Sequence, residues 1–133
     1  MSDAECFLIE PTDGGPWRRT DTGEERRSPH EFGPGAMWDA SWMTPPWAVR
    51  SNGDAMNIVV ILPNGRVWSV DNRASNCDRP AEDHDCWCRH GTPPNLTVDK
   101  QPEPGRSTCS AGAGSILMGD WHGFLRSGGL VVA

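Results

Sequence analysis

Apolar positions along this chain fall in short runs that glycine, proline and polar residues separate. The clearest pattern covers residues 55–71 (AMNIVVILPNGRVWSVD), where an apolar, β-branched run meets Pro63-Asn64-Gly65 and an alternating run follows. An Asn-Gly pair between two such runs is typical of a β-hairpin. The pattern therefore predicts two antiparallel strands joined by a tight turn at residues 63–65.

Several other short runs have the alternation or the β-branched content of strands, and none has helical periodicity over ten residues or more. The predicted strands are residues 3–10, 95–99, 113–118, 121–126 and 130–132. Ser127-Gly128-Gly129 between the last two predicts a second hairpin. The chain is therefore expected to fold as a mainly β, small single domain of short antiparallel strands and hairpins with long loops, and with at most one or two short helices.

Two segments before the first hairpin need a separate interpretation. Residues 11–35 are polar and rich in proline and glycine, which predicts a polar arm or loop ahead of a β core over residues 36–133. Residues 37–47 hold three tryptophans, of which Trp38 and Trp42 have the i, i+4 spacing of one face of a helical turn. We expect this block to pack in the core, whereas an exposed Trp/Met patch would mark a partner site.

Composition and charge narrow the range of partners and compartments. The chain has 133 residues, of which 36% are hydrophobic, and its 15 glycines and 12 prolines favour a loop-rich fold. A net charge of −6 argues against nucleic-acid binding, which needs clustered basic residues. No apolar stretch has the length of a signal peptide core or a membrane span, so we expect a soluble, cytoplasmic protein with reduced thiols.

The chain concentrates cysteine and histidine in residues 77–109. Zinc prefers four thiolate or imidazole ligands, and an extended strand would point the side chains of Cys86, Cys88 and His90 to one face. We predict a structural zinc ion with ligands drawn from Cys77, Cys86, Cys88, His90 and Cys109. The alternative is that the cysteines are buried as small hydrophobic side chains, which is also the expectation for Cys6.

A glycine-rich turn and a later histidine offer the groups that a hydrolase needs. Residues 109–115 contain Ser110 and Ser115 among glycines, whose backbone N–H groups can face an oxyanion. His122 lies in a predicted strand, where either serine on an adjacent strand would reach its imidazole. The predicted catalytic residues are therefore Ser110, Ser115 and His122.

Two acidic residues and one glycine complete this candidate site. Asp99 or Asp120 would orient the imidazole, as the third member of a Ser-His-Asp relay does. Gly123 leaves space beside the ring. The chain has no GxSxG motif, and the alternative is a hairpin with a hydrogen-bonded structural histidine.

Four blocks of the chain resemble small proteins of actinobacteriophages. They are residues 75–77 (SNC), 86–91 (CWCRHG), 109–115 (CSAGAGS) and 121–126 (WHGFLR). The same blocks are more distantly similar to the predicted peptidases of bacterial ubiquitin-like conjugation operons, which trim a ubiquitin-like precursor. The resemblance implies a peptidase-like fold and pocket, and a location in the bacterial host cell or in the virion.

The motifs of the peptidase family match this chain in part. Cys86, Cys88 and Gly91 match a Cys-x-Cys-x-Cys-Gly motif, with His90 in place of the third cysteine. Ser110 and Gly112 match a Pro-Ser-Ile-Gly turn, with Cys109 in place of the proline. A Ser-His-aromatic strand that ends in Arg-x-Gly is matched at His122, Phe124, Arg126 and Gly128. The chain departs from it at Trp121, where the family has serine, and lacks the cysteine before that pair.

These observations lead to one main functional hypothesis and two alternatives. The main hypothesis is a small, zinc-stabilised, serine-type hydrolase or peptidase that acts on a protein or peptide. The first alternative is a non-enzymatic phage accessory or virion protein that binds a protein partner through residues 37–47. The second is a catalytic metal with His122 among its ligands.

Overall fold

The predicted β-hairpin at residues 55–71 is the centre of the fold. The computed structural model describes residues 3–40, 56–70, 87–101 and 114–133. Strand β6 (Ile58–Ile61) pairs antiparallel with β7 (Val67–Ser69), which confirms the hairpin. The turn closes through a hydrogen bond from the Leu62 amide to the Arg66 carbonyl, and Gly65 adopts a φ of 85° that favours glycine.

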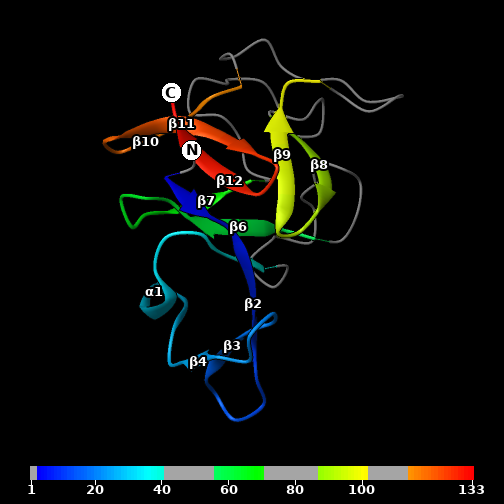
Figure 1. The fold of residues 1–133 in the computed structure, drawn as a ribbon, viewed down its shortest axis with the longest axis vertical. Helices are drawn as coiled ribbons and strands as arrows, with labels where there is room; N and C mark the ends of the chain where they lie inside the picture. Colours follow the sequence, from blue (N-terminus) through cyan, green and yellow to red (C-terminus); the bar gives the residue numbers. More distant parts are fainter. Residues whose placement is uncertain (1–2, 41–55, 71–86, 102–113) are drawn as a thin grey trace, which may run out of the picture.

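The hairpin belongs to a six-stranded sheet with the order β4-β3-β2-β5-β6-β7 (Figure 1). Its remaining strands are β2 (Phe7–Pro11), β3 (Trp17–Arg19), β4 (Glu25–Arg26) and β5 (Ala36–Asp39). All neighbours in this sheet are antiparallel except β2 and β5, which are parallel.

Two further antiparallel sheets complete the described part of the chain. One has the order β1-β12-β11-β10, with strands β1 (Ala4–Glu5), β12 (Gly129–Val132), β11 (Trp121–Arg126) and β10 (Ile116–Met118). The other pairs β8 (Cys88–Thr92) with β9 (Asn95–Asp99). The strands predicted at 95–99 and 121–126, and the hairpin through residues 127–129, are confirmed. The fold is mainly β with antiparallel sheets, as predicted.

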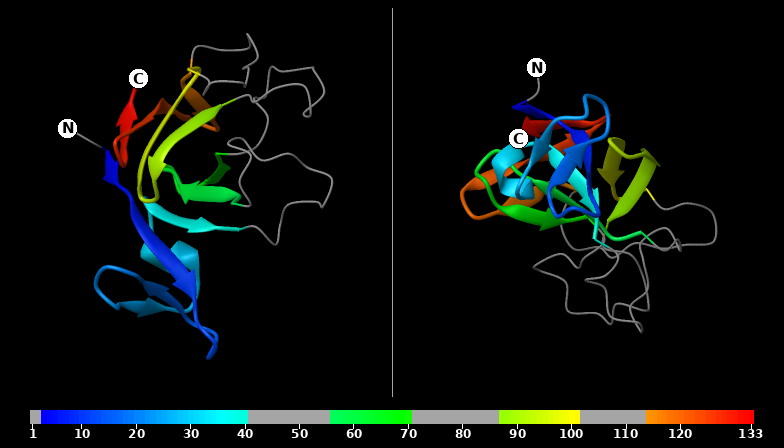
Figure 2. Two further views of the ribbon diagram at one scale, coloured as in Figure 1. Left: turned by 90° about the vertical axis from the view of Figure 1, so that its right-hand side faces the viewer. Right: turned by 90° about the horizontal axis from the view of Figure 1, so that it is seen from below.

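The strand predicted at residues 3–10 is divided between two sheets. The Cys6 amide donates to the Gly128 carbonyl at 2.7 Å, and the next amide, of Phe7, donates to the Gly35 carbonyl at 3.0 Å. The N-terminal segment therefore runs from the edge of the four-stranded sheet into the six-stranded one (Figure 2). This segment connects the two sheets through the backbone itself.

The segment predicted as a polar arm or loop, residues 11–35, contains the strands β3 and β4 and the one-turn helix α1 (Pro29–Phe32). Its few apolar side chains hold it against the sheet. The rings of Trp17 and Trp38 pack edge to face with centroids 5.7 Å apart, and Phe7 and Phe32 lie 6.1 Å apart. No helix in the described ranges is long and apolar enough to cross a membrane.

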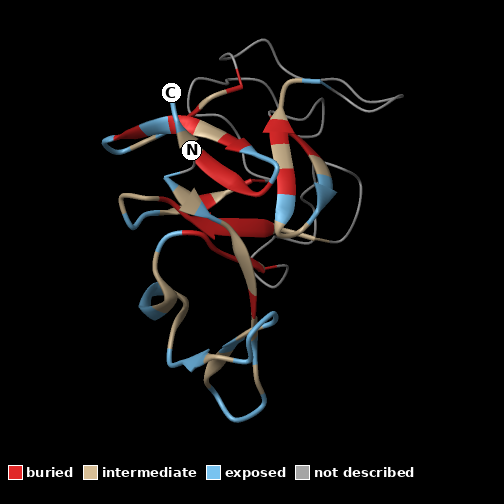
Figure 3. Ribbon diagram, in the orientation of Figure 1, coloured by how far each residue is buried: buried red, intermediate tan, exposed pale blue. Residues whose placement is uncertain are grey.

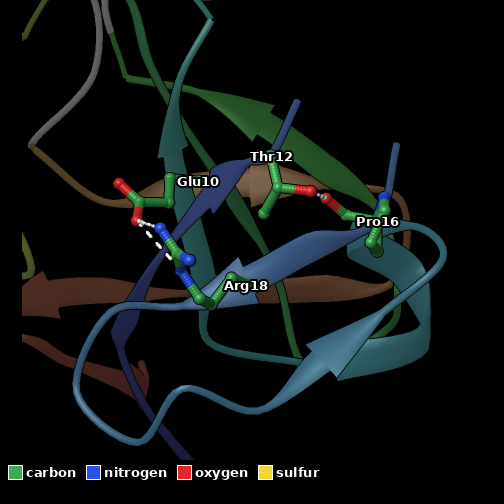
Figure 4. Close-up of polar contacts among 4 residues, drawn as sticks. All are labelled: Glu10, Thr12, Pro16 and Arg18. Carbon is green, nitrogen blue, oxygen red and sulfur yellow. Dashed lines mark hydrogen bonds and ion pairs between the residues drawn. The ribbon is translucent and has the colours of Figure 1, made fainter. Parts of the chain in front are cut away.

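The arginines of this segment pair with neighbouring acids, as expected of a solvated polar surface. Arg18 donates to Glu10 across β2 and β3 at 2.7 Å, close to the Thr12–Pro16 contact that closes their turn (Figure 4). The other pairs are Arg19–Asp21, Arg26–Glu24 and Arg27–Glu31. Exposed ion pairs of this kind each contribute at most about 1 kcal/mol.

Buried side chains form two clusters on opposite faces of β6. The ribbon of β6 is coloured as buried (Figure 3). Ile58, Val60 and Leu62 face the larger cluster, to which β7, β9, β10, β11 and β12 also contribute. Val59 and Ile61 face the smaller cluster, which β2 and β5 complete. Strand β6 is buried on both faces, which explains its continuous apolar sequence.

The tryptophan-rich block is only partly within the described residues. Met37 and Trp38 are buried, so the expectation of core packing is confirmed for these two side chains. The predicted helical turn is wrong at Trp38, because residues 36–39 form β5 and pair with β6. The i, i+4 spacing of the tryptophans did not determine the local structure, because pairing with β6, which is distant in the sequence, stabilises a strand here. Trp42 lies outside the described residues.

Candidate functional site

The structure places Ser115 and His122 in direct contact. Ser115 immediately precedes β10, and His122 is the second residue of β11. Antiparallel pairing sets Leu117 opposite His122, so Ser115 lies on the diagonal of the same sheet face. The Ser115 Oγ and His122 Nε2 atoms are 2.9 Å apart, which is hydrogen-bond distance.

This pair lies on the outer face of the four-stranded sheet. Along β11, Trp121, Gly123 and Leu125 are buried, whereas His122 and Arg126 are exposed. Leu117, directly across from His122, has 66% of its surface exposed. The pair is therefore open to solvent, with an exposed apolar side chain beside it.

Gly123 has a different role from the one predicted. A Cβ atom at this position would lie 2.3 Å from the Val131 carbonyl oxygen and 2.5 Å from the ring of Trp121. The expectation of free space beside His122 is wrong, because Trp121 and Gly123 share the inner face and the indole covers the glycine. Glycine at this position allows Trp121 to pack in the core.

The two carboxylates expected to orient His122 have other partners. Asp120 Oδ1 accepts a hydrogen bond from Asn64 Nδ2 at 2.9 Å, which ties the β6–β7 turn to the β10–β11 turn. Asp99 Oδ1 contacts His90 Nε2 at 2.9 Å and also accepts from the Gln101 amide. Among the described residues, the contact to the imidazole of His122 comes from Ser115.

The glycine-rich turn is described only at its end. Ser110 and the other residues up to 113 lie outside the described residues. Gly114 is buried and has a φ of 90°. A Cβ atom added at this position would lie 3.7 Å from the Lys100 side chain and 3.8 Å from the Asp99 backbone. The start of β10 therefore lies against the end of β9, which brings Ser115 near the β8–β9 hairpin.

Two of the five predicted zinc ligands lie within the described residues. Cys88 and His90 are two positions apart in β8 and share one face, with Asp99 directly opposite Cys88. Cys88 is buried and His90 is about one-third exposed. Cys77, Cys86 and Cys109 lie outside the described residues. Within the described part, no three Cys, His, Asp or Glu side chains are grouped as metal ligands.

The contact between His90 and Asp99 is the feature that sequence reasoning missed. The short β8–β9 hairpin turns at Pro93-Pro94, which pairs Thr92 with Asn95 and thereby sets Cys88 opposite Asp99. Counting outward from that proline pair would have found the register. The stack of the Arg126 guanidinium on the Phe124 ring, at 4.1 Å, follows from their i, i+2 spacing on β11.

Comparison with known proteins does not assign the chain to a family or a function. No protein-family model matches the chain, and no curated protein or solved structure matches it either. The resemblance to phage proteins and to the conjugation-operon peptidases therefore stays a hypothesis.

Proposed function

We propose that this protein is a small serine-type hydrolase in which Ser115 is the nucleophile and His122 the general base. The observation that supports the proposal is the 2.9 Å separation of Ser115 Oγ and His122 Nε2. A hydroxyl becomes a useful nucleophile when a base at hydrogen-bond distance takes its proton. Antiparallel pairing of β10 and β11 holds the two side chains on one face.

The reaction would follow the usual two steps of acyl transfer. Ser115 Oγ attacks the substrate carbonyl carbon while His122 Nε2 accepts the hydroxyl proton. The tetrahedral intermediate then collapses, and the imidazolium returns the proton to the leaving group. A water molecule, deprotonated by His122, hydrolyses the acyl-enzyme in the second step. Backbone N–H groups of the glycine-rich turn before Ser115 are the proposed donors to the oxyanion.

The expected rate is low compared with a complete Ser-His-Asp relay. Loss of the aspartate function in serine proteases lowers kcat by about 10⁴-fold. In the described part of this chain, Asp99 and Asp120 are engaged by His90 and Asn64 instead. We therefore expect slow turnover and choose covalent labelling as the first test.

A fluorophosphonate probe provides this test, because it reacts with activated serines. We expect labelling of the wild type and its loss in both Ser115→Ala and His122→Ala. Matched controls are Ser28→Ala and His30→Ala, which lie at the start of α1 and are distant in the fold. Both controls should label like the wild type.

Two outcomes would contradict the proposal. If labelling persists in Ser115→Ala but disappears in Ser110→Ala, the nucleophile is the other serine. If the wild type is not labelled, or both Ser115→Ala and His122→Ala label normally, the contact is a structural hydrogen bond that ties β10 to β11. Absence of labelling in the wild type would favour the non-enzymatic binding module.

The binding-module alternative has one observation in its favour. Leu117 is largely exposed on the outer sheet face, next to His122 and two strand positions from the partly buried Ser115. A contiguous exposed apolar patch marks a protein-binding surface, and Leu117 would be one part of such a patch. Met37 and Trp38 are buried, so these two side chains of the segment 37–47 would contribute nothing to a binding surface, and residues 41–47 lie outside the described residues.

We also propose that zinc stabilises the β8–β9 end of the molecule, with Cys88 and His90 among its ligands. Metal-binding histidines usually donate their second ring nitrogen to a carboxylate, and the His90–Asp99 contact has this form. The thiol of Cys88 lies two positions away on the same face of β8. A complete set of four protein ligands leaves no position for a reacting water, so the role would be structural.

Metal analysis tests this proposal directly. We expect one zinc ion per chain in the purified wild type, and a lower Tm after chelation. Cys88→Ser and His90→Ala should lose the metal, and Asp99→Asn should weaken its binding by about 10- to 100-fold. Cys6→Ser is the matched control and should retain it. A wild type without zinc, or full zinc content in His90→Ala, would exclude the proposed site.

A further inference from the structure

The outer face of β11 carries more than His122. Phe124 and Arg126 follow at alternate positions and point to the same side of the sheet. The guanidinium of Arg126 lies over the Phe124 ring, 4.1 Å from its centroid. Gly129, which pairs with Arg126 on β12, has no side chain to cover it.

The charge of Arg126 is not neutralised within the described part of the protein. Arg18, Arg19, Arg26 and Arg27 each form an ion pair with a nearby carboxylate. Arg126 has an aromatic contact but no ion pair among the described residues. In a chain with a net charge of −6, an exposed cation fixed on an aromatic ring is suited to bind an anionic group.

The strand geometry sets the distance of this cation from the reactive pair. Phe124 is two residues from His122, which corresponds to about 7 Å along a strand. The guanidinium lies 4.1 Å from the Phe124 ring centroid, which places it about 7 to 11 Å from the imidazole along the strand, and an aspartate side chain of the peptide adds to the reach of its backbone. A peptide extended along β11 covers this distance with two residues.

We propose that the substrate is an extended peptide with a carboxylate two residues from the scissile carbonyl, bound by Arg126. This inference rests on the proposed hydrolase function and identifies its substrate class. Leu117, exposed and directly opposite His122, contacts an apolar side chain of the residue that is cleaved. Phe124 holds the guanidinium in place and is a positioning residue.

Peptide binding to the Ser115→Ala protein tests the proposal without requiring turnover. The probes are acetyl-Ala-Leu-Ala-Asp-amide and acetyl-Asp-Ala-Leu-Ala-amide, which cover both chain directions, and the same peptides with Asn in place of Asp. In one of the two directions we expect the Asp peptide to bind about fivefold more tightly than its Asn counterpart, as an exposed charge pair provides. The affinities are measured by chemical-shift titration.

The matched pair of variants is Arg126→Gln and Arg27→Gln, each made in the Ser115→Ala protein. Both remove one exposed positive charge, but Arg27 lies just before α1 and pairs with Glu31. Arg126→Gln should abolish the preference for Asp, and Arg27→Gln should keep it. The variant Leu117→Ala should weaken both the Asp and the Asn peptide.

The results separate this inference from the proposed hydrolase function. Equal affinity for the Asp and Asn peptides in both directions, or equal effects of the two Arg→Gln variants, would overturn the carboxylate site even if fluorophosphonate labelling succeeds. An Arg126-dependent preference without labelling of the wild type would support the carboxylate site and refute the hydrolase.

Discussion

Cys6 lies at the point where the N-terminal segment passes from one sheet to the other, and its environment changes the chemistry of its thiol. Burial, and to a smaller extent the negative charge of Glu5, raise the pKa of Cys6 from 9.0 to about 12. The folded protein therefore keeps the thiol proton at pH values where the unfolded chain loses it. The contribution of Cys6 to stability is complete below pH 9 and falls as the pH rises towards 12.

This linkage predicts a difference between the wild type and Cys6→Ala. The free energy of unfolding of the wild type should fall more steeply with pH in the alkaline range than that of the variant. Urea denaturation at pH values of about 8 and about 10.5 measures both slopes, and other titrating groups cancel in the comparison. Parallel slopes would mean that the Cys6 thiol titrates normally in the folded protein.

The β6–β7 hairpin shows how a turn positions strands that are distant in the sequence. Its turn residue Asn64 donates from Nδ2 to the Met118 carbonyl and to Asp120 Oδ1, both at 2.9 Å. The turn of one sheet is thereby attached to the turn of another, beside the strands that carry Ser115 and His122. The conformation of this turn depends on Gly65, whose φ is 85°.

Gly65→Ala should destabilise the protein by about 1–2 kcal/mol, which is the cost of a left-handed backbone for an L-residue. No atom lies within 4 Å of the position that the new Cβ would take, so the cost is conformational and not steric. Gly65→Asn should lose less, because asparagine tolerates this conformation. The control is Gly14→Ala, where the backbone is not left-handed and the nearest atom is 3.8 Å away. A loss of stability in Gly14→Ala as large as that in Gly65→Ala would contradict the argument.

At the scale of the whole molecule, the two hydrophobic clusters share strand β6. Alternate residues of β6 face the two clusters, so neither cluster can keep its packing if this strand leaves the sheet. The N-terminal segment adds a second connection, because β1 pairs with β12 and β2 pairs with β5. The two clusters are therefore expected to unfold together.

Ile9→Ala in the smaller cluster and Leu125→Ala in the larger one test this coupling. Each removes a buried side chain and should cost about 2–5 kcal/mol. Both variants should still unfold in one transition, with coincident midpoints by tryptophan fluorescence and far-UV circular dichroism. Separate transitions in Ile9→Ala would show that the smaller cluster is an independent unit.

Much of the strand pattern and one contact of the candidate site could be predicted from the sequence. The hairpin at residues 55–71, the strands at 95–99 and 121–126, and the turn at 127–129 depend on local signals. The contact of Ser115 with His122 followed from expecting them on adjacent strands. The partners of Asp99 and Asp120 could not be predicted, because they depend on which strands and turns meet.

The sequence by itself determined the positions of many strands and turns, since alternation and residues such as Gly65 act within a few positions of the chain. It also placed His122 on a strand. Only the tertiary structure decided that residues 4–11 contribute one strand to each of two sheets and that the polar segment 11–35 contains strands. It also decided that His90 contacts Asp99. The physical reason is that the hydrogen-bond partners of a strand's backbone and the side chains that pack on its faces come from distant parts of the chain. The local sequence does not specify these partners.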